Sequence, residues 1–169
     1  MTLEQRVEAM EIELARVRAR EEICQLKARY FNACDRQDPE AVRACFAEGE
    51  VEIDMSYFGH CSNRDEFVDG IFVARGCHDH VLDMHHGANP EIEVIDAQRA
   101  TGVWSLDYRN INTLEQTVTL LSALYYDEYR RIDGQWRISA SRTEYRTVLH
   151  CSYQPGSLQV ATAARSLAG

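Results

Sequence analysis

Two adjacent histidines are the side chains best suited to proton transfer in this sequence. They stand in Met84-His85-His86-Gly87-Ala88-Asn89, between two predicted strands. Histidine changes charge near neutral pH, so it can act as a general base or a general acid. Because successive strand residues point to opposite faces, only one of the two can line a given cavity. The other is expected at the surface or at an interface.

An aspartate ends the apolar face of a predicted helix, in the segment Ala28-Arg29-Tyr30-Phe31-Asn32-Ala33-Cys34-Asp35. A helix C-terminus does not favour a negative charge. Asp35 is therefore either an ordinary exposed aspartate, the commoner case, or a carboxylate with a cationic or hydrogen-bonding partner. A histidine is a good candidate for that partner.

The elements that must position these residues begin with helices. Near the N-terminus, five apolar residues recur at alternating steps of four and three: Leu3, Val7, Met10, Leu14 and Val17. This spacing is an a/d seam with charged flanks, and two heptads are too short to hold a coiled coil alone. The seam must pack on the domain or on a second subunit. The pattern breaks at Glu21 and restarts at Ile23, which predicts a separate second helix over residues 20–35.

Short helices and then strands are predicted after residue 35. Asp38-Pro39-Glu40 is a helix start, and Ser62-Asn63-Arg64-Asp65 resembles a capping box before a helix that carries Phe67, Ile71 and Phe72. Asp133-Gly134 is a strong hairpin signal. The strands are predicted over residues 51–57, 81–87, 91–96, 100–111, 116–132 and 135–148. Helices followed by antiparallel strands indicate an α+β fold with helices packed on one face of the sheet.

The chain has the size of one domain with two appendages. It contains 169 residues with no repeat, no low-complexity run and no Pro/Gly-rich linker. We expect an N-terminal helix for packing or oligomerisation over residues 1–19, a central domain over residues 20–149 and a loosely docked tail over residues 150–169.

Charge and cysteine usage exclude several classes of partner. The chain has 18 basic and 27 acidic residues, a net charge of −9, which argues against nucleic acid and against an anionic membrane surface. No stretch reaches the roughly 18 apolar residues of a membrane span. The N-terminus has no apolar signal region, and the six scattered cysteines form no C-x-x-C pair. We therefore expect free thiols and a cytoplasmic location.

Four short motifs carry a resemblance to a known family. They are Tyr30-x4-Asp35, Met84-His85-x-Gly87-x-x-Pro90-Glu91-Ile92, Gly102-x-Trp104 and Asp133-Gly134-x-Trp136. Together they resemble the SnoaL-like, scytalone dehydratase-like group of the nuclear transport factor 2-like superfamily, over about residues 1–148. Within that group the likeness is nearest to the bile acid 7α-dehydratases. The resemblance implies a cone-shaped α+β barrel of the cystatin-like type, in which helices and a strongly curved, mostly antiparallel sheet enclose an apolar pocket.

The same resemblance implies an activity and its residues. In the family, a helix-end aspartate and a strand histidine form a dyad, and these positions are Asp35 and His85 here. The histidine takes a proton from a substrate carbon, and the aspartate orients the ring. A helical tyrosine that polarises the substrate matches Tyr30. The implied function is a lyase of the dehydratase type or an isomerase, acting without a cofactor on an apolar cyclic substrate that is steroid-, polyketide- or aromatic-like.

One position departs from the family pattern. The dehydratases have a second carboxylate on the long strand after the tryptophan, and counting from His85 places that position at Tyr108. The neighbouring Asp107 falls on the opposite face by alternation. Either Tyr108 serves as the acid, or the register slips, or the protein does not expel hydroxide in the same way. Tyr57, at the end of the first predicted strand, is a further candidate hydroxyl donor.

Two alternatives remain open at this stage. The histidine pairs at 78 and 80 and at 85 and 86 could suggest a metal site. Metal-ligating histidines usually come with a carboxylate or cysteine ligand, and no such third ligand of matched spacing is indicated, so we expect no metal. The protein could also be a non-catalytic binding or scaffold subunit, as in the small subunits of ring-hydroxylating dioxygenases. A charged pair inside an apolar cavity argues against that role, because burying it without purpose is costly.

The longest predicted strand is apolar on both of its faces. One face carries Leu121, Tyr125 and Tyr129, and the other carries Val118, Leu120, Leu124 and Tyr126. If one face lines the cone, the other needs a cover, and a second copy of the chain is the expected cover. The sequence thus predicts a homodimer or homotrimer that binds an apolar small molecule.

Overall fold

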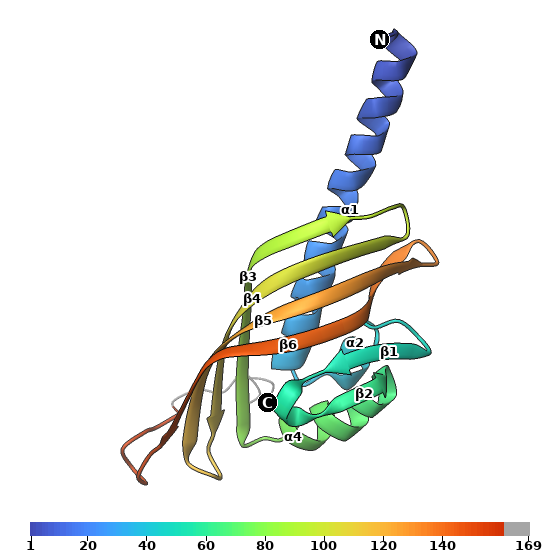
Figure 1. Cartoon of the computed structure of the whole chain (residues 1–169). Coiled ribbons are helices and arrows are strands. Elements are labelled where there is room, and N and C mark those ends of the chain that lie inside the picture. The colour runs from blue at the N-terminus through green and yellow to red at the C-terminus, as the bar shows by residue number, and fades with distance from the viewer. Residues whose placement is uncertain (161–169) are drawn as a thin grey trace, which may run out of the picture.

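The computed structural model describes residues 1–160, apart from the side chain of Tyr57. It is an α+β fold with one long helix and a six-stranded curved sheet in the order β2-β1-β6-β5-β4-β3. Every neighbouring pair of strands is antiparallel except β1 and β6. Figure 1 shows the second half of α1 lying across one face of this sheet. The predicted fold class, with helices on one face of a mostly antiparallel sheet, is confirmed.

The helical segments and strands have the following bounds. The helices are α1 (Leu3–Asp35), α2 (Pro39–Arg43), α3 (Arg64–Phe67) and α4 (Ala74–Gly76), with a 3-10 turn η1 (Ser56–Phe58) and a π-helical segment η2 (Val68–Val73). The strands are β1 (Glu50–Asp54), β2 (His60–Asn63), β3 (Val81–Val94), β4 (Arg99–Asn112), β5 (Thr117–Ile132) and β6 (Gln135–Ser152). None of the helices in residues 1–160 is long and apolar enough to cross a membrane.

The predicted break between two N-terminal helices is wrong. Residues 3–35 form one continuous helix, so the expected boundary between residues 19 and 20 falls inside α1. The change of apolar phase at Glu21 has another cause. All residues from 3 to 18 are exposed, and burial begins at Ala19. The phase changes where the helix first meets the sheet, because from there on a different face is buried.

Two of the later strands also differ from the prediction. Residues 81–94 form one strand instead of two, with a register irregularity between Ala88 and Glu91. Pro90 has no N–H to donate to the sheet. It is tolerated here because it lies at this irregularity in an edge strand, which has only one neighbouring strand. Strand β6 runs to Ser152, so the first residues of the expected tail belong to the sheet. Residues 161–169 of that tail lie outside the described residues.

The first strand ends earlier than predicted. Strand β1 stops at Asp54, and Tyr57 lies in the 3-10 turn η1 instead of at a strand end. Gly59 follows with φ 116°, a backbone conformation that favours glycine, and the chain turns back as the unpredicted strand β2. The side chain of Tyr57 is not among the described parts of the chain, so its expected role stays a prediction.

The predicted helix cap at Asp38 and the predicted hairpin at Asp133-Gly134 are confirmed. Asp38 caps α2 by accepting the N–H of Ala41 at 3.0 Å, and Asp133-Gly134 forms the β5–β6 hairpin with both residues at positive φ. The cap of α3 is one residue later than expected. The N-cap is Asn63 and not Ser62, and its side chain accepts the N–H of Glu66 at 2.8 Å. Asparagine is a favoured N-cap residue and needs no capping box to fill this role.

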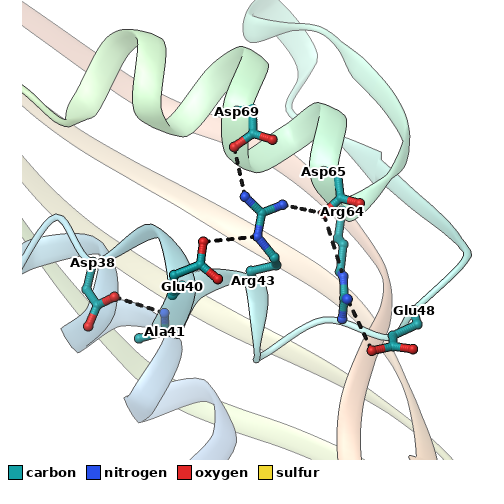
Figure 2. Close-up of polar contacts among 8 residues, drawn as sticks. All are labelled: Asp38, Glu40, Ala41, Arg43, Glu48, Arg64, Asp65 and Asp69. Atoms are coloured by element: carbon teal, nitrogen blue, oxygen red, sulfur yellow. Dashed lines mark hydrogen bonds and ion pairs between the residues drawn. The ribbon is translucent and has the colours of Figure 1, made fainter.

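A cluster of ion pairs joins α2 to the helical layer formed by α3 and η2. Arg43 contacts Glu40, Asp65 and Asp69, and Arg64 contacts Glu48 (Figure 2). The Arg43 side chain is only 20% exposed, and hydrogen bonds to Asp69 and Asp65 raise its pKa. This cluster joins α2 to the helical layer, and Phe67, Ile71 and Phe72 of that layer face the enclosed space.

The long strand β5 divides its faces as predicted. Tyr125 and Tyr129 are buried in the core beneath α1, and Leu121 lines the enclosed space. On the opposite face, Leu120 is 41% exposed. The core between α1 and the sheet is completed by Ile23, Leu26, Phe31, Trp104, Leu106, Trp136 and Ile138.

Candidate active site

A cavity of about 730 Å³ lies between the sheet, the end of α1 and the helical layer. Its walls are mostly apolar and aromatic, with Phe67, Ile71, Phe72, Leu106 and Leu121 among them. This size and lining are typical of small-molecule sites. Four of its polar groups lie on α1 and on the neighbouring strands β3 and β4: Asp83, His85, Tyr108 and Tyr30.

His85 lines the cavity and contacts Asp35 behind it, so the predicted contact between these two residues is present. The Nδ1 atom of His85 lies 2.6 Å from Oδ1 of Asp35, and the two side chains are 13% and 16% exposed. The backbone N–H of His85 also donates to the same carboxylate, at 3.0 and 3.2 Å. An ionised carboxylate can only accept, so Nδ1 carries the proton and Nε2 is left as the basic nitrogen. His86 is exposed on the other face, as alternation required.

Two aromatic rings contact the ring of His85. Phe31 stacks on it with ring centroids 5.8 Å apart and an interplanar angle of 16°, and the Tyr108 ring lies 4.6 Å away. Phe31 fits only because residue 87 is glycine. A Cβ on Gly87 would lie 2.2 Å from the Phe31 ring. The Met-His-x-Gly motif therefore supplies both the histidine and the space for the ring that orients it.

Tyr108 stands opposite His85 on the neighbouring strand, and a carboxylate accompanies it. The hydroxyl of Tyr108 donates to Oδ1 of Asp83 at 2.6 Å, and Nδ2 of Asn110 donates to the same oxygen at 2.7 Å. Burial, followed by the Asp83 charge, raises the pKa of Tyr108, so the phenol keeps its proton. Asp107 is exposed on the opposite face, as predicted. Tyr108 thus occupies the position of the family carboxylate and is hydrogen-bonded to a carboxylate of the neighbouring strand β3.

Tyr30 also lines the cavity, from the last turns of α1. It is 4% exposed, and its ring packs edge-on against Phe46 with centroids 5.6 Å apart. Burial raises the pKa of Tyr30 well above its ordinary value. Tyr30 is therefore a neutral hydrogen-bond donor in an apolar wall.

A buried ion pair supports the wall from behind. Nζ of Lys27 donates to Oδ2 of Asp127 at 2.7 Å, and both side chains are fully buried. Asp127 also accepts the hydroxyls of Tyr129 and Ser141, at 2.8 and 2.7 Å. Burial lowers the pKa of Lys27, and Asp127 opposes that shift. The ammonium group lies 3.9 Å from the Tyr125 ring centroid, so this network fixes the aromatic floor of the cavity.

Further histidines lie at the rim of the cavity. His78 and His80 stack with centroids 5.1 Å apart, and His150 contacts Thr119. His78 uses its Nε2 in a contact with the carbonyl of Ala74 at 2.9 Å. Among residues 1–160, no group of three or more His, Cys, Asp or Glu side chains is arranged to hold a metal ion.

A second hollow, also about 730 Å³, lies elsewhere on the sheet. It is lined by Thr101, Val103, Tyr126 and Arg142 together with several carboxylates: Glu52, Asp54, Glu91, Glu93 and Glu128. This lining contains no histidine, and neither member of the dyad reaches it. Three of the predicted site residues, Tyr30, His85 and Tyr108, line the first cavity.

Sequence reasoning did not single out Asp83, Asn110 or the Lys27–Asp127 pair. Asp83 had a usable signal, since it lies two residues before His85 and so shares its face of the strand. Asn110 relates to Tyr108 in the same way. The Lys27–Asp127 pair had none, because Lys27 looks like part of an apolar helical stripe and its partner is 100 residues away.

Comparisons with known proteins agree with this architecture. A proposed scytalone dehydratase from Novosphingobium aromaticivorans is 18% identical, with a TM-score of 0.72 over 89% of this chain and 95% of that one. Hexachlorocyclohexane dehydrochlorinase LinA type 3 from Novosphingobium barchaimii is 18% identical, with a TM-score of 0.71 over 85% and 99%. A cystatin-like protein of unknown function from Nostoc punctiforme is 25% identical, with a TM-score of 0.61 over 75% and 90%.

The match at the level of sequence family covers most of the chain. Residues 15–142 match the SnoaL-like domain. This segment includes the whole buried part of α1, all of β1 to β5, and the part of β6 that pairs with β1. It also includes Asp35 and His85. The resemblance noted from the short motifs is confirmed, and the chain belongs to the SnoaL-like domain family.

Proposed function

We propose that this protein is a cofactor-independent lyase, or an isomerase with the same first step, acting on an apolar cyclic small molecule. The observation that carries the proposal is the 2.6 Å contact between His85 Nδ1 and Asp35 Oδ1 at a mostly apolar cavity. A base oriented by a carboxylate, with its second nitrogen unprotonated, is the arrangement that general-base catalysis requires.

The first step of the proposal is removal of a proton from carbon. Nε2 of His85 takes a proton from the carbon next to a substrate carbonyl, and the C–H electron pair moves to form an enolate. Asp35 stabilises the imidazolium that forms, as in other His–Asp pairs. The phenol of Tyr30 donates a hydrogen bond to the enolate oxygen, and it does so without carrying a charge itself.

The second step distinguishes a lyase from an isomerase. In an elimination, the enolate electrons form a C=C bond and the leaving group departs with its bonding pair. A leaving hydroxide takes the proton of Tyr108, and the imidazolium of His85 then returns a proton to the Tyr108 phenolate. A halide leaves without needing that proton. In an isomerisation, His85 returns the same proton to a different carbon.

Two further observations support a lyase over a role in binding alone. The structural neighbours include a proposed dehydratase and a dehydrochlorinase, and both names describe eliminations. In addition, Tyr108, Asp83 and Asn110 form a polar corner directly beside the His85 ring. A pocket that only holds an apolar ligand needs neither a polar corner nor a charged pair, because buried polar groups must be satisfied at a cost.

Proton exchange tests the first step without knowledge of the natural substrate. Cyclic ketones with a β-hydroxyl or a β-halogen are incubated with the protein in heavy water, and NMR follows deuterium uptake at carbon and loss of the leaving group. We expect exchange with the wild type and with His86→Ala, whose side chain lies on the other face. We expect none with His85→Ala. Full exchange with His85→Ala, or probes that bind in the cavity with no exchange, would refute the proposal.

A further inference from the structure

The N-terminal part of α1 stands apart from the rest of the fold. Residues 3–18 are all exposed, and Figure 1 shows this dark blue segment projecting beyond the sheet. Its start is well defined, because Thr2 and Gln5 form a reciprocal capping box with bonds of 2.9 and 3.2 Å. Leu3 is 75% and Met10 69% exposed, so apolar side chains face water.

The spacing of these apolar residues indicates what covers them. Val7 and Leu14 occupy a positions, and Leu3, Met10 and Val17 occupy d positions, so all five lie along one stripe. The second half of α1 is already fixed by burial from Ala19 onward. A partner for the stripe therefore does not have to supply the free energy of helix formation, which is the main obstacle for a two-heptad coiled coil.

The charges beside the stripe match a second copy of the same helix in parallel. Arg6 and Glu13 lie at g positions, and Glu11 and Arg18 lie at the e positions five residues further on. In a parallel coiled coil, each g residue meets the e residue of the next heptad on the partner. Arg6 then meets Glu11 of the other chain, and Glu13 meets Arg18. Both contacts are attractive, and symmetry doubles each one.

An antiparallel pair would bring mostly like charges together, because g then faces g and e faces e. Centred on the same stripe, Glu13 would meet Glu13, Glu11 would meet Glu11 and Arg6 would meet Arg20. Glu13 also contacts Arg16 of its own helix at 2.8 Å, but that pair is exposed and contributes little.

We propose that residues 3–18 of α1 pair in parallel with the same segment of a second copy of this chain. The pairing buries the exposed a/d stripe and places Arg6 against Glu11 and Glu13 against Arg18. The segment therefore acts as an assembly element that is separate from the cavity, and the proposal does not depend on the proposed function.

Cysteine cross-linking tests the direction of the pairing. In a parallel pair residue 7 faces its own copy, whereas in an antiparallel pair it faces residue 17. Under mild oxidation, Val7→Cys should give a disulfide-linked dimer on a non-reducing gel. Glu8→Cys, at an outward b position, and the wild type with its native cysteines are the controls. A yield with Val7→Cys no higher than with Glu8→Cys would overturn the proposal.

Charge reversal tests the flanking contacts by sedimentation. Glu11→Arg turns two attractive contacts into repulsive ones, so the association constant should fall about tenfold. Adding Arg6→Glu should restore it, and Glu8→Arg should leave it unchanged. Because antiparallel helices would keep a like-charge contact at residue 11, unchanged association of Glu11→Arg contradicts the proposal. A Met10→Asp variant that assembles as the wild type does would contradict it independently.

Discussion

The Asp35 carboxylate holds His85 by two different groups, the ring Nδ1–H at 2.6 Å and the backbone N–H at 3.0 Å. The end of α1 is thereby joined to the backbone and the ring of one residue of β3. The backbone bond sets where the carboxylate sits, and the ring bond sets which nitrogen carries the proton. The negative charge that a helix C-terminus disfavours is compensated by this strand residue.

Replacing Asp35 by asparagine should separate these two functions. The amide oxygen of the new side chain can still accept the backbone N–H, but its NH₂ group would donate to Nδ1 and force the proton onto Nε2. We expect Asp35→Asn to slow proton abstraction by roughly 10³- to 10⁴-fold, as in other His–Asp pairs, with little change in probe binding. Deuterium exchange gives the rate and NMR titration gives the affinity. Retention of the full rate would show that the tautomer of His85 is not set by Asp35.

The role of Tyr108 can be tested by changing the leaving group. If Tyr108 protonates a departing hydroxide, Tyr108→Phe should slow elimination of water by roughly 10²- to 10⁴-fold. Elimination of chloride from the matched β-chloro probe needs no proton and should change little. The ratio of the two rates is the measurement. An equal loss with both probes would mean that Tyr108 only shapes the cavity.

Gly87→Ala should disturb the site through Phe31 and not through the backbone. The new Cβ would lie 2.2 Å from the Phe31 ring, which must move and lose its stack on His85. We expect a loss of about 1–3 kcal/mol in the free energy of unfolding, typical of overpacking, measured by urea denaturation. Gly70→Ala is the control, since its Cβ would contact nothing within 4 Å. Phe31→Leu combined with Gly87→Ala should recover part of the loss.

Four tyrosines, three of them buried and Tyr108 partly buried, predict how stability responds to alkaline pH. Burial is the largest cause that raises the pKa of each of these residues: Tyr30, Tyr108, Tyr125 and Tyr129. The unfolded chain releases these protons near pH 10, whereas the folded chain keeps them. Their contribution to stability is therefore complete below about pH 10 and is lost as the pH rises further. Urea denaturation across this range should show a shallower decline for Tyr108→Phe, and an identical decline would contradict the prediction.

The family resemblance predicts the pairing of Asp35 with His85, and local signals are consistent with it. Asp35 is unfavourable at its helix end without a partner, and alternation allows only one of the two histidines to line a given cavity. The carboxylate beside Tyr108 could not be assigned in the same way. Its position depends on the pairing of His85 with Tyr108 across β3 and β4, which is a property of strand register and not of either strand alone.

The N-terminal helix was predicted from the right residues with the wrong boundary. Its apolar positions change phase at Glu21, and a change of phase looks the same whether the helix breaks or meets a new neighbour. Only the onset of burial at Ala19 distinguishes these cases. In β3, strands are predicted on either side of residues 88–90, but the edge strand continues through them with a register irregularity between Ala88 and Glu91.

The Lys27–Asp127 pair should be strongly coupled in its effect on stability. Lys27→Met leaves a fully buried carboxylate without its cation, so we expect a loss of about 3–5 kcal/mol in the free energy of unfolding. Asp127→Asn in the same chain removes that orphaned charge, and its amide oxygen can still accept from Tyr129 or Ser141. The double variant should therefore be more stable than Lys27→Met alone. Arg146→Met, which breaks an exposed pair with Glu144, should cost no more than about 1 kcal/mol. If the effects of Lys27→Met and Asp127→Asn simply add, the two groups do not stabilise the fold as a pair.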